Sequence, residues 1–436
     1  MALVKFIRHT AAFSTNLEKA MLKFQRKYGD SFFLQLMPHR GVWFFSKADA
    51  VKEVFSAEPE TFANLEPADA MTILVGSDSL IVAGGEQHLC HKRAMLPIFN
   101  ENSVKLLVDT MRSCTHAEIK KWRSGGMINI SAAMQNISLN IIISSLFGIV
   151  DPQQIPLFRK QTRALLKSYT PSLMFMPALR NKLWYPWRKF LRARAQFDRL
   201  LLKEIEMVRQ AKPSNRNDFL SGLAKLDFPN GQQWTALELC DQLKTLLIAG
   251  HDTLSIALGW AIFYIYSHPA IHARLLAELQ SADNLSIETI VKLPYLDAVR
   301  KEVLRFHPAV PFVMRTLAKP YAFGGQHLPA GSTIGVSITL LHSDPTIWKN
   351  PMEFNPDRFL TQKFSSYEYA PFGGGVKKCL GGHFAVYEMK IILVAILLNY
   401  QFDIQKKEPP TRIYGLTMNP RRPIFGTVRS FKERKN

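Results

Sequence analysis

Cys379, near the C-terminal end of the chain, lies between two groups of glycines. Residues 371–382 read Pro-Phe-Gly-Gly-Gly-Val-Lys-Lys-Cys-Leu-Gly-Gly, and an apolar run that indicates a buried helix follows directly. A thiol at the start of a helix tends to ionise, and glycines let the backbone approach a flat ligand closely. This arrangement suits a thiolate that binds haem iron. On spacing alone, however, a lone cysteine here is more often a small core residue.

A second pattern that could do chemistry lies inside a long apolar stretch, residues 236–267, which predicts one helix ended by His268-Pro269. Its middle reads Ala249-Gly250-His251-Asp252-Thr253. Glycine inside a helix costs roughly 1 kcal/mol relative to alanine, so something needs room there. The buried acid and hydroxyl need partners or water. The alternative is a packing notch with a threonine bonded to the preceding turn.

Two further pairs of polar residues share helix faces. Glu302 and Arg305 are i, i+3 neighbours in a helix predicted from Tyr295 up to Pro308, and His88 and Lys92 are i, i+4 neighbours in a helix that opens at Gly85. Exposed pairs of this kind are common and contribute little to stability. From spacing alone, a surface position is at least as good an explanation for both pairs.

Taken in chain order from His88 to Gly381, these segments resemble the motifs of the cytochrome P-450 family, and the resemblance covers nearly the whole chain. Phe372, Gly375, Lys377, Cys379 and Gly381 match the haem-binding loop of that family position by position. The resemblance implies one mainly helical (α+β) domain over residues 1–436, with a small β-sheet region and a buried haem b. It also implies a monomer.

The resemblance assigns Cys379 as the axial iron ligand, in a loop built with Phe372, Gly373 and Gly381. Lys377 would face a haem propionate; many members carry Arg or His there, and Lys keeps the charge but loses the bidentate fork. Further contacts to the propionates are expected from His88, Lys92, Arg93 and, as a weaker candidate, Arg315.

In the long helix, the family pattern implies that Ala249 and Gly250 leave space for dioxygen. Asp252 and Thr253, with ordered water, would deliver protons during dioxygen cleavage. Family members that work as peroxygenases or isomerases often lack this acid–Thr pair. The pattern also joins Glu302 and Arg305 to Arg358, from Phe354-Asn355-Pro356-Asp357-Arg358, in a buried ion network that would hold the cysteine loop.

We therefore expect a haem-thiolate monooxygenase that inserts one oxygen atom from O2 into a lipophilic small molecule, by hydroxylation or epoxidation. Electrons would come singly from a separate donor of ferredoxin or flavodoxin type with its reductase. The alternatives are a peroxide-rearranging or peroxygenase enzyme on the same fold, and a non-catalytic haem-binding or ligand-sensing protein. The candidate substrate pocket is apolar: Met71, Leu74, Leu246, Val310, Phe312, Val313, Leu416 and Met418.

Composition adds a strong basic balance. The 436 residues carry a formal net charge of +20 and four cysteines without paired or metal-type spacing, which fits a reducing compartment. No nucleic-acid motif is found, so a solvated basic surface or the docking of an acidic redox protein near Lys377 and Lys378 explains the charge. A nucleic-acid binder is the weakest alternative.

Two regions bear on membranes. The apolar stretch that begins at Met1 is too short and interrupted for a signal peptide or span, so we expect a soluble, cytoplasmic, bacterial-type protein without a transmembrane anchor. Residues 173–188 combine an apolar tip with basic and aromatic side chains. They suit a mobile lid over an apolar pocket, which is preferred, or a peripheral contact with an anionic bilayer.

The remaining pattern predicts mostly helices with a few strands. We expect helices over 16–28, 48–57, 102–123, 131–147, 157–169 and 187–212, a loop-rich stretch over 64–85, and strands over 31–36, 41–46, 311–336 and 402–428.

Overall fold

A computed structural model describes residue 9 and residues 16–36, 41–64, 69–148, 154–210, 217–228, 231–405 and 407–430. The chain is mainly helical with small sheets, as expected. Contacts divide it into two compact units: unit 1 comprises residues 1–57, 111–138 and 252–436, and unit 2 comprises residues 58–110 and 139–251. The apolar stretch at Met1 and the end of the helix predicted to reach Lys212 lie outside the described residues.

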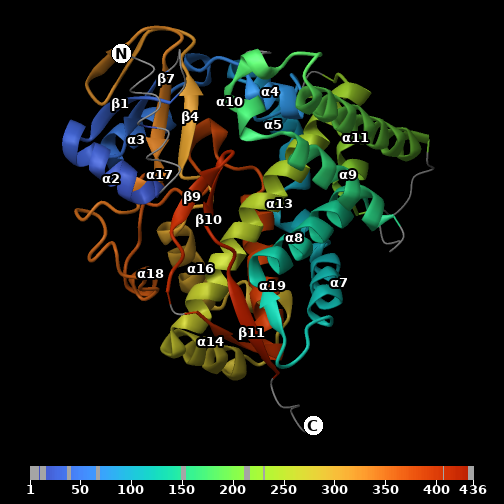
Figure 1. The fold of residues 1–436 in the computed structure, drawn as a ribbon, viewed down its shortest axis with the longest axis vertical. Coiled ribbons are helices and arrows are strands. Elements are labelled where there is room, and N and C mark those ends of the chain that lie inside the picture. Colours follow the sequence, from blue (N-terminus) through green and yellow to red (C-terminus); the bar gives the residue numbers. More distant parts are fainter. Residues whose placement is uncertain are drawn as a thin grey trace. The chain divides into compact units, whose positions relative to one another are not determined.

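Unit 1 holds the strands and most of the C-terminal helices (Figure 1). Its helices are α2 (Leu17–Tyr28), α3 (Ala48–Ser56), α14 (Pro269–Ser281), α15 (Ile287–Ile290), α16 (Pro294–Phe306), α17 (Ile338–Leu341), α18 (Arg358–Thr361), η4 (Gly375–Lys377) and α19 (Gly382–Asn399). Its strands are β1 (Ser31–Gln35), β2 (Gly41–Phe45), β3 (Met127–Asn129), β4 (Phe312–Thr316), β5 (Tyr321–Phe323), β6 (Gln326–Leu328), β7 (Thr333–Ser337), β8 (Tyr400–Ile404), β9 (Thr411–Tyr414), β10 (Thr417–Pro420) and β11 (Phe425–Ser430).

Unit 2 is helical. It contains η1 (Pro59–Thr61), α4 (Ala70–Val75), α5 (Gly85–Met95), η2 (Leu96–Ile98), α6 (Glu101–Lys105), α9 (Ile155–Ser168), α10 (Pro171–Phe175), η3 (Pro177–Leu179), α11 (Tyr185–Gln210) and α12 (Phe219–Leu223). Three helices continue from one unit into the other along the chain: α7 (Val108–Ile119), α8 (Ile130–Phe147) and α13 (Ala236–Ser267).

The main sheet of unit 1 has the strand order β1-β2-β7-β4, in which β2 and β7 are parallel and the other pairs antiparallel. Phe32 and Leu34 of β1 are buried while Phe33 between them is exposed, as the period of two requires. Helix α2 begins at a capped residue, because the Asn16 side chain accepts the N–H of Lys19 at 3.0 Å. Its apolar face joins the sheet in one hydrophobic core cluster.

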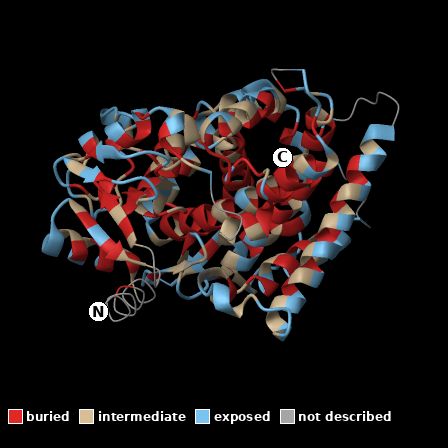
Figure 2. Cartoon of the chain, turned by 90° about the horizontal axis from the view of Figure 1, so that it is seen from above, coloured by how far each residue is buried: buried red, intermediate tan, exposed pale blue. Residues whose placement is uncertain are grey.

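Three described helices are long and apolar enough to cross a membrane: α8, α13 and α19. Of the apolar window of each, 72%, 67% and 67% respectively is buried inside the protein. Figure 2 shows how buried residues gather on inner helix faces and exposed residues on outer ones. The apolar character of these helices therefore matches core packing.

One local prediction was wrong. The helix expected over 102–123 is broken into α6 and α7 at residues 106 and 107, although neither glycine nor proline stands there. The described part of the stretch 64–85 is mostly loops and turns, as expected, with the short helix α4 inside it, whose Leu74 and Val75 are buried.

Candidate functional site

The loop before Cys379 is shaped by two glycines in the left-handed region. Gly373 and Gly375 both have φ of 66°, which side chains rarely adopt. A Cβ on Gly375 would lie 2.0 Å from the backbone oxygen of Phe55 in α3, so the loop packs against that helix without room for a side chain. The Cys379 N–H donates to the Phe372 carbonyl at 2.9 Å and closes the loop. The Cys379 side chain is exposed, three residues before α19 begins.

Two cations come together beside this loop. Strand β4 lies against it, because a Cβ on Gly373 would contact Val313 at 3.8 Å. Arg315 follows two residues along that strand, on the same face. Burial, together with the nearby charge of Arg315, lowers the pKa of Lys377 to about 7. Burial lowers the pKa of Arg315 to about 10. Two half-buried cations side by side favour an anionic ligand, and the propionates of a haem bound at Cys379 fit that requirement.

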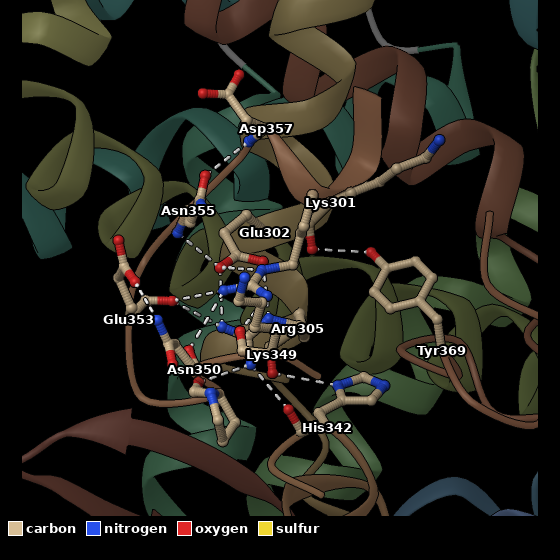
Figure 3. A network of polar contacts seen from close by, with 12 residues as sticks. Lys301, Glu302, Arg305, His342, Lys349, Asn350, Glu353, Asn355, Asp357 and Tyr369 are labelled. Atoms are coloured by element: carbon tan, nitrogen blue, oxygen red, sulfur yellow. Dashed lines mark hydrogen bonds and ion pairs between the residues drawn. The ribbon is translucent and has the colours of Figure 1, made fainter. Parts of the chain in front are cut away.

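The Glu302 carboxylate is the centre of a buried ion network (Figure 3). Arg305 donates to it twice, at 2.7 and 2.8 Å, and Arg358 donates at 3.2 Å. The backbone N–H of Asn355 adds a fourth bond at 2.8 Å. The two guanidinium groups also donate to backbone carbonyls of the segment 342–353, including Pro351 at 2.9 Å and Lys349 at 2.8 Å. The structure thus brings Arg358 to the Glu302–Arg305 pair, although Arg358 lies 56 residues after Glu302 in the sequence.

Asp252 is held by a strand far away in the sequence. The Thr417 hydroxyl of β10 donates to Asp252 Oδ2 at 2.8 Å, and the Asn419 amide donates to the same hydroxyl oxygen at 2.9 Å. Burial raises the pKa of Asp252, while the bond from Thr417 lowers it. A carboxyl with a raised pKa exchanges its proton more readily near neutral pH. Thr253, the next residue, is half-buried.

Unit 2 holds the remaining candidates. Ala249 is exposed, whereas a Cβ on Gly250 would meet the Ile142 side chain of α8 at 3.0 Å. Close packing against α8 on this side of the helix therefore favours a glycine at position 250. His88 is buried, and its Nδ1 lies 3.0 Å from the Leu80 carbonyl. Lys92 is half-buried and Arg93 is exposed.

The apolar pocket candidates differ in burial. Of the two candidates in unit 2, Leu74 is buried and Leu246 is half-buried. Leu416 of unit 1 is 39% exposed at the turn between β9 and β10. Met418 is fully buried in the core cluster of α2 and the main sheet, so packing accounts for it. Met71, Val310, Phe312 and Val313 are half-buried, and Phe312 packs against the same cluster.

Sequence reasoning missed Thr417 and Asn419, which hold the acid of α13. Both residues lie in β10. Their sequence neighbours Leu416 and Met418 are predicted as pocket residues because they are apolar. No local signal marks them, because Thr417 is 165 residues from the carboxylate that it binds.

Known proteins resemble the chain over most of its length. Residues 3–426 match the Cytochrome P450 family. A protein of Mycobacterium bovis provisionally named cytochrome P450 135B1 is 33% identical over 378 residues, covering 86% of this chain and 79% of the relative. Its provisionally named counterpart 135A1 of Mycobacterium tuberculosis is 29% identical over 377 residues, covering 86% of this chain and 82% of the relative.

A solved structure shares the fold. Cyanobacterial CYP120A1 with retinoic acid bound is 27% identical and superimposes with a TM-score of 0.83, covering 94% of each chain. Together with the match over residues 3–426, this likeness shows that the chain belongs to the cytochrome P450 family.

Proposed function

We propose that the chain is a haem-thiolate monooxygenase. The observation that carries this proposal is the cysteine loop: a single thiol is presented by a glycine-shaped turn, with Lys377 and Arg315 converging beside it. A thiolate ligand with adjacent cations is the donor set that a haem with propionates requires. Cys379 would hold the iron, and the two cations would hold the propionates.

When bound, the haem would supply one-electron chemistry and dioxygen activation, which the thiolate favours by donating electron density. The chain's own residues would do the rest. Asp252, whose pKa is raised by desolvation and which is positioned by Thr417, is suited to passing protons toward Thr253. The Glu302 network fixes the end of α16 and the segment 342–358.

The apolar candidates favour a lipophilic small-molecule substrate. Leu74, Leu246 and Leu416 offer no charge to bind a polar group. A relative of the same fold binds retinoic acid, a long apolar molecule with one carboxylate. We therefore propose hydroxylation or epoxidation of a compound of that general character.

Electrons would come from a separate acidic donor of ferredoxin or flavodoxin type with its reductase. The net charge of +20 and the exposed Lys378 in the cysteine loop support such a docking. We propose a cytoplasmic monomer, in line with bacterial relatives. Leu183 and Tyr185, 87% and 61% exposed beside Lys182, suit a peripheral contact with an anionic bilayer.

The test is optical and isotopic. The ferric protein should change from low to high spin with a lipophilic compound, and that compound should then gain one atom of labelled oxygen from ¹⁸O₂ when a ferredoxin and its reductase supply electrons. Purified protein without thiolate-ligated haem would contradict the proposal. Turnover with peroxide in the absence of electrons would favour the peroxygenase alternative, and ligand binding without turnover would favour a sensor.

A further inference from the structure

His342 connects two parts of unit 1 that the sequence does not place together. It follows α17 and is 1% exposed. Its Nδ1 lies 3.1 Å from the Arg305 carbonyl oxygen, and its Nε2 lies 3.0 Å from the backbone nitrogen of Ala370. A carbonyl oxygen can only accept, so Nδ1 must carry the proton, and the Ala370 N–H must donate to a bare Nε2. The two bonds together fix one neutral tautomer of the ring.

The surroundings hold this ring in place (Figure 3). The Tyr369 ring stacks on it with centroids 5.3 Å apart. The Trp348 ring meets it edge-on, with centroids 6.1 Å apart. Arg305 donates to the carbonyl of His342 at 2.8 Å, so residues 305 and 342 are joined in both directions. Burial and the charge of Arg305 lower the pKa of His342 to about 3. The ring therefore stays neutral, as both of its hydrogen bonds require.

The bond to Ala370 reaches the start of the cysteine loop. Ala370 is 1% exposed, and its carbonyl accepts the N–H of Gly373 at 3.0 Å. Gly373 is the first of the two glycines with positive φ, and the loop closes when the Cys379 N–H donates to Phe372. A continuous series of hydrogen bonds thus runs from Glu302 through Arg305 and His342 to the backbone that presents the thiol.

We propose that His342 is a positioning residue: by bridging the last turn of α16 and Ala370, it fixes where the cysteine loop begins and thereby keeps the Cys379 thiolate on the iron. This inference rests on the proposed haem-thiolate function. In this inference the His342 side chain connects the ion network to the loop. The connection depends on Nε2, which accepts the hydrogen bond from Ala370.

Two substitutions separate the two bonds of the ring. In His342→Asn the amide occupies the place of Nδ1, so the bond to Arg305 can be kept while Ala370 loses its acceptor. In His342→Gln the side-chain oxygen occupies the place of Nε2 and can still accept from Ala370. Tyr369→Phe is the matched control, because it keeps the stacked ring and removes the hydroxyl that donates to the Lys301 carbonyl at 3.0 Å.

Two quantities are measured on the full-length, haem-loaded protein. One is the hydrogen-exchange rate of the Ala370 amide; the other is the rate at which the ferrous carbon monoxide complex loses its thiolate-type spectrum. In H342N we expect both rates to rise on the order of tenfold, the factor that corresponds to about 1.4 kcal/mol. In H342Q and Y369F both rates should stay within about threefold of the parent, since the loop keeps its bond.

A general structural role would make the two His342 variants alike, with both rates following the loss of thermal stability, and that result would overturn the inference. An unchanged Ala370 exchange rate in H342N would also overturn the inference about His342. The proposed function would still stand in that case if the parent protein holds thiolate-ligated haem. If the parent held no such haem, the proposed function would fail, and Ala370 exchange would still decide whether the bridge exists.

A measurement on the unaltered protein guards against variants that do not fold. Nitrogen NMR of histidine-labelled protein should show His342 with its proton on Nδ1 between pH 6 and 8. A ring protonated on Nε2 instead would overturn the inference, because that nitrogen could not accept from Ala370.

Discussion

Glu302 and Asp252 are both carboxylates of unit 1, the first fully buried and the second half-buried, but their surroundings differ in kind. Glu302 accepts bonds from two guanidinium groups and a backbone N–H, at distances between 2.7 and 3.2 Å. Within the described part of the chain, the Asp252 carboxylate accepts one hydrogen bond, from the Thr417 hydroxyl. Glu302 is thus surrounded by compensating charge, whereas Asp252 is half-buried beside a neutral hydroxyl.

This difference matches two different tasks. A carboxylate between two buried arginines cannot lose its charge without leaving those cations unpaired, so it suits a residue that holds the fold. A carboxylate whose pKa is raised by desolvation holds a proton more readily than an exposed one, so it suits a residue that passes protons. Each prediction below changes one side of this comparison.

The largest effect is expected from Glu302→Gln. The substitution keeps the size of the side chain but removes the charge between Arg305 and Arg358, which are 2% and 7% exposed. Breaking a buried ion network in this way costs about 3–5 kcal/mol. We expect a protein that unfolds at much lower urea concentration and is recovered largely without haem. Equilibrium unfolding and the ratio of haem to protein measure both.

Arg274→Gln is the control for Glu302→Gln. Arg274 pairs with Asp357 at 2.6 Å, but the two side chains are 48% and 52% exposed, and exposed pairs contribute less than about 1 kcal/mol. Haem content should be normal in this variant. Equal loss of stability in the two variants would contradict the distinction between a buried network and a surface pair.

The sequence predicted the elements that carry strong local signals. Helix α13 has the expected bounds, Ala236–Ser267, because its apolar run ends at His268-Pro269. Glu302 and Arg305 share a helix turn, so their pairing could be expected. Their third partner, Arg358, was expected through the family pattern. His342 and Thr417 were not found, because their partners are backbone atoms or side chains that tertiary structure alone brings near.

The next effect concerns activity and leaves stability intact. Asp252→Asn keeps an oxygen that can accept from Thr417 but removes the exchangeable proton. If Asp252 relays protons, turnover should fall by about 10²- to 10³-fold, and more of the electrons supplied should be lost to peroxide. Haem content and the spin shift on adding substrate should stay normal. Turnover within about threefold of the parent would contradict the role given to this acid.

A smaller effect is expected at the pair of cations beside the cysteine. Lys377→Met should speed haem loss about tenfold, because one of the two charges that would face the propionates is removed. The haem-free form should gain slightly in stability, since a like-charge pair of half-buried groups is relieved. Transfer of haem to apomyoglobin measures the loss rate.

Lys378→Met is the matched control for Lys377→Met. Lys378 is the next residue and carries the same charge, but its side chain is exposed. Haem loss should be unchanged there, while the rate of reduction by an acidic donor should fall, more so at low salt. Identical haem-loss rates in the two lysine variants would contradict a specific anion site at Lys377 and Arg315.

The smallest effect sharpens the comparison most, because it alters one hydrogen bond. Thr417→Val removes the hydroxyl that stabilises ionised Asp252, so the pKa of this acid should rise further. The limb of the pH–rate profile that reports Asp252 should then move to higher pH, by roughly half a unit to one unit. Thr417→Ser keeps the hydroxyl and should leave the profile in place. A shift to lower pH, or equal shifts in both variants, would mean that Thr417 does not control the charge of Asp252.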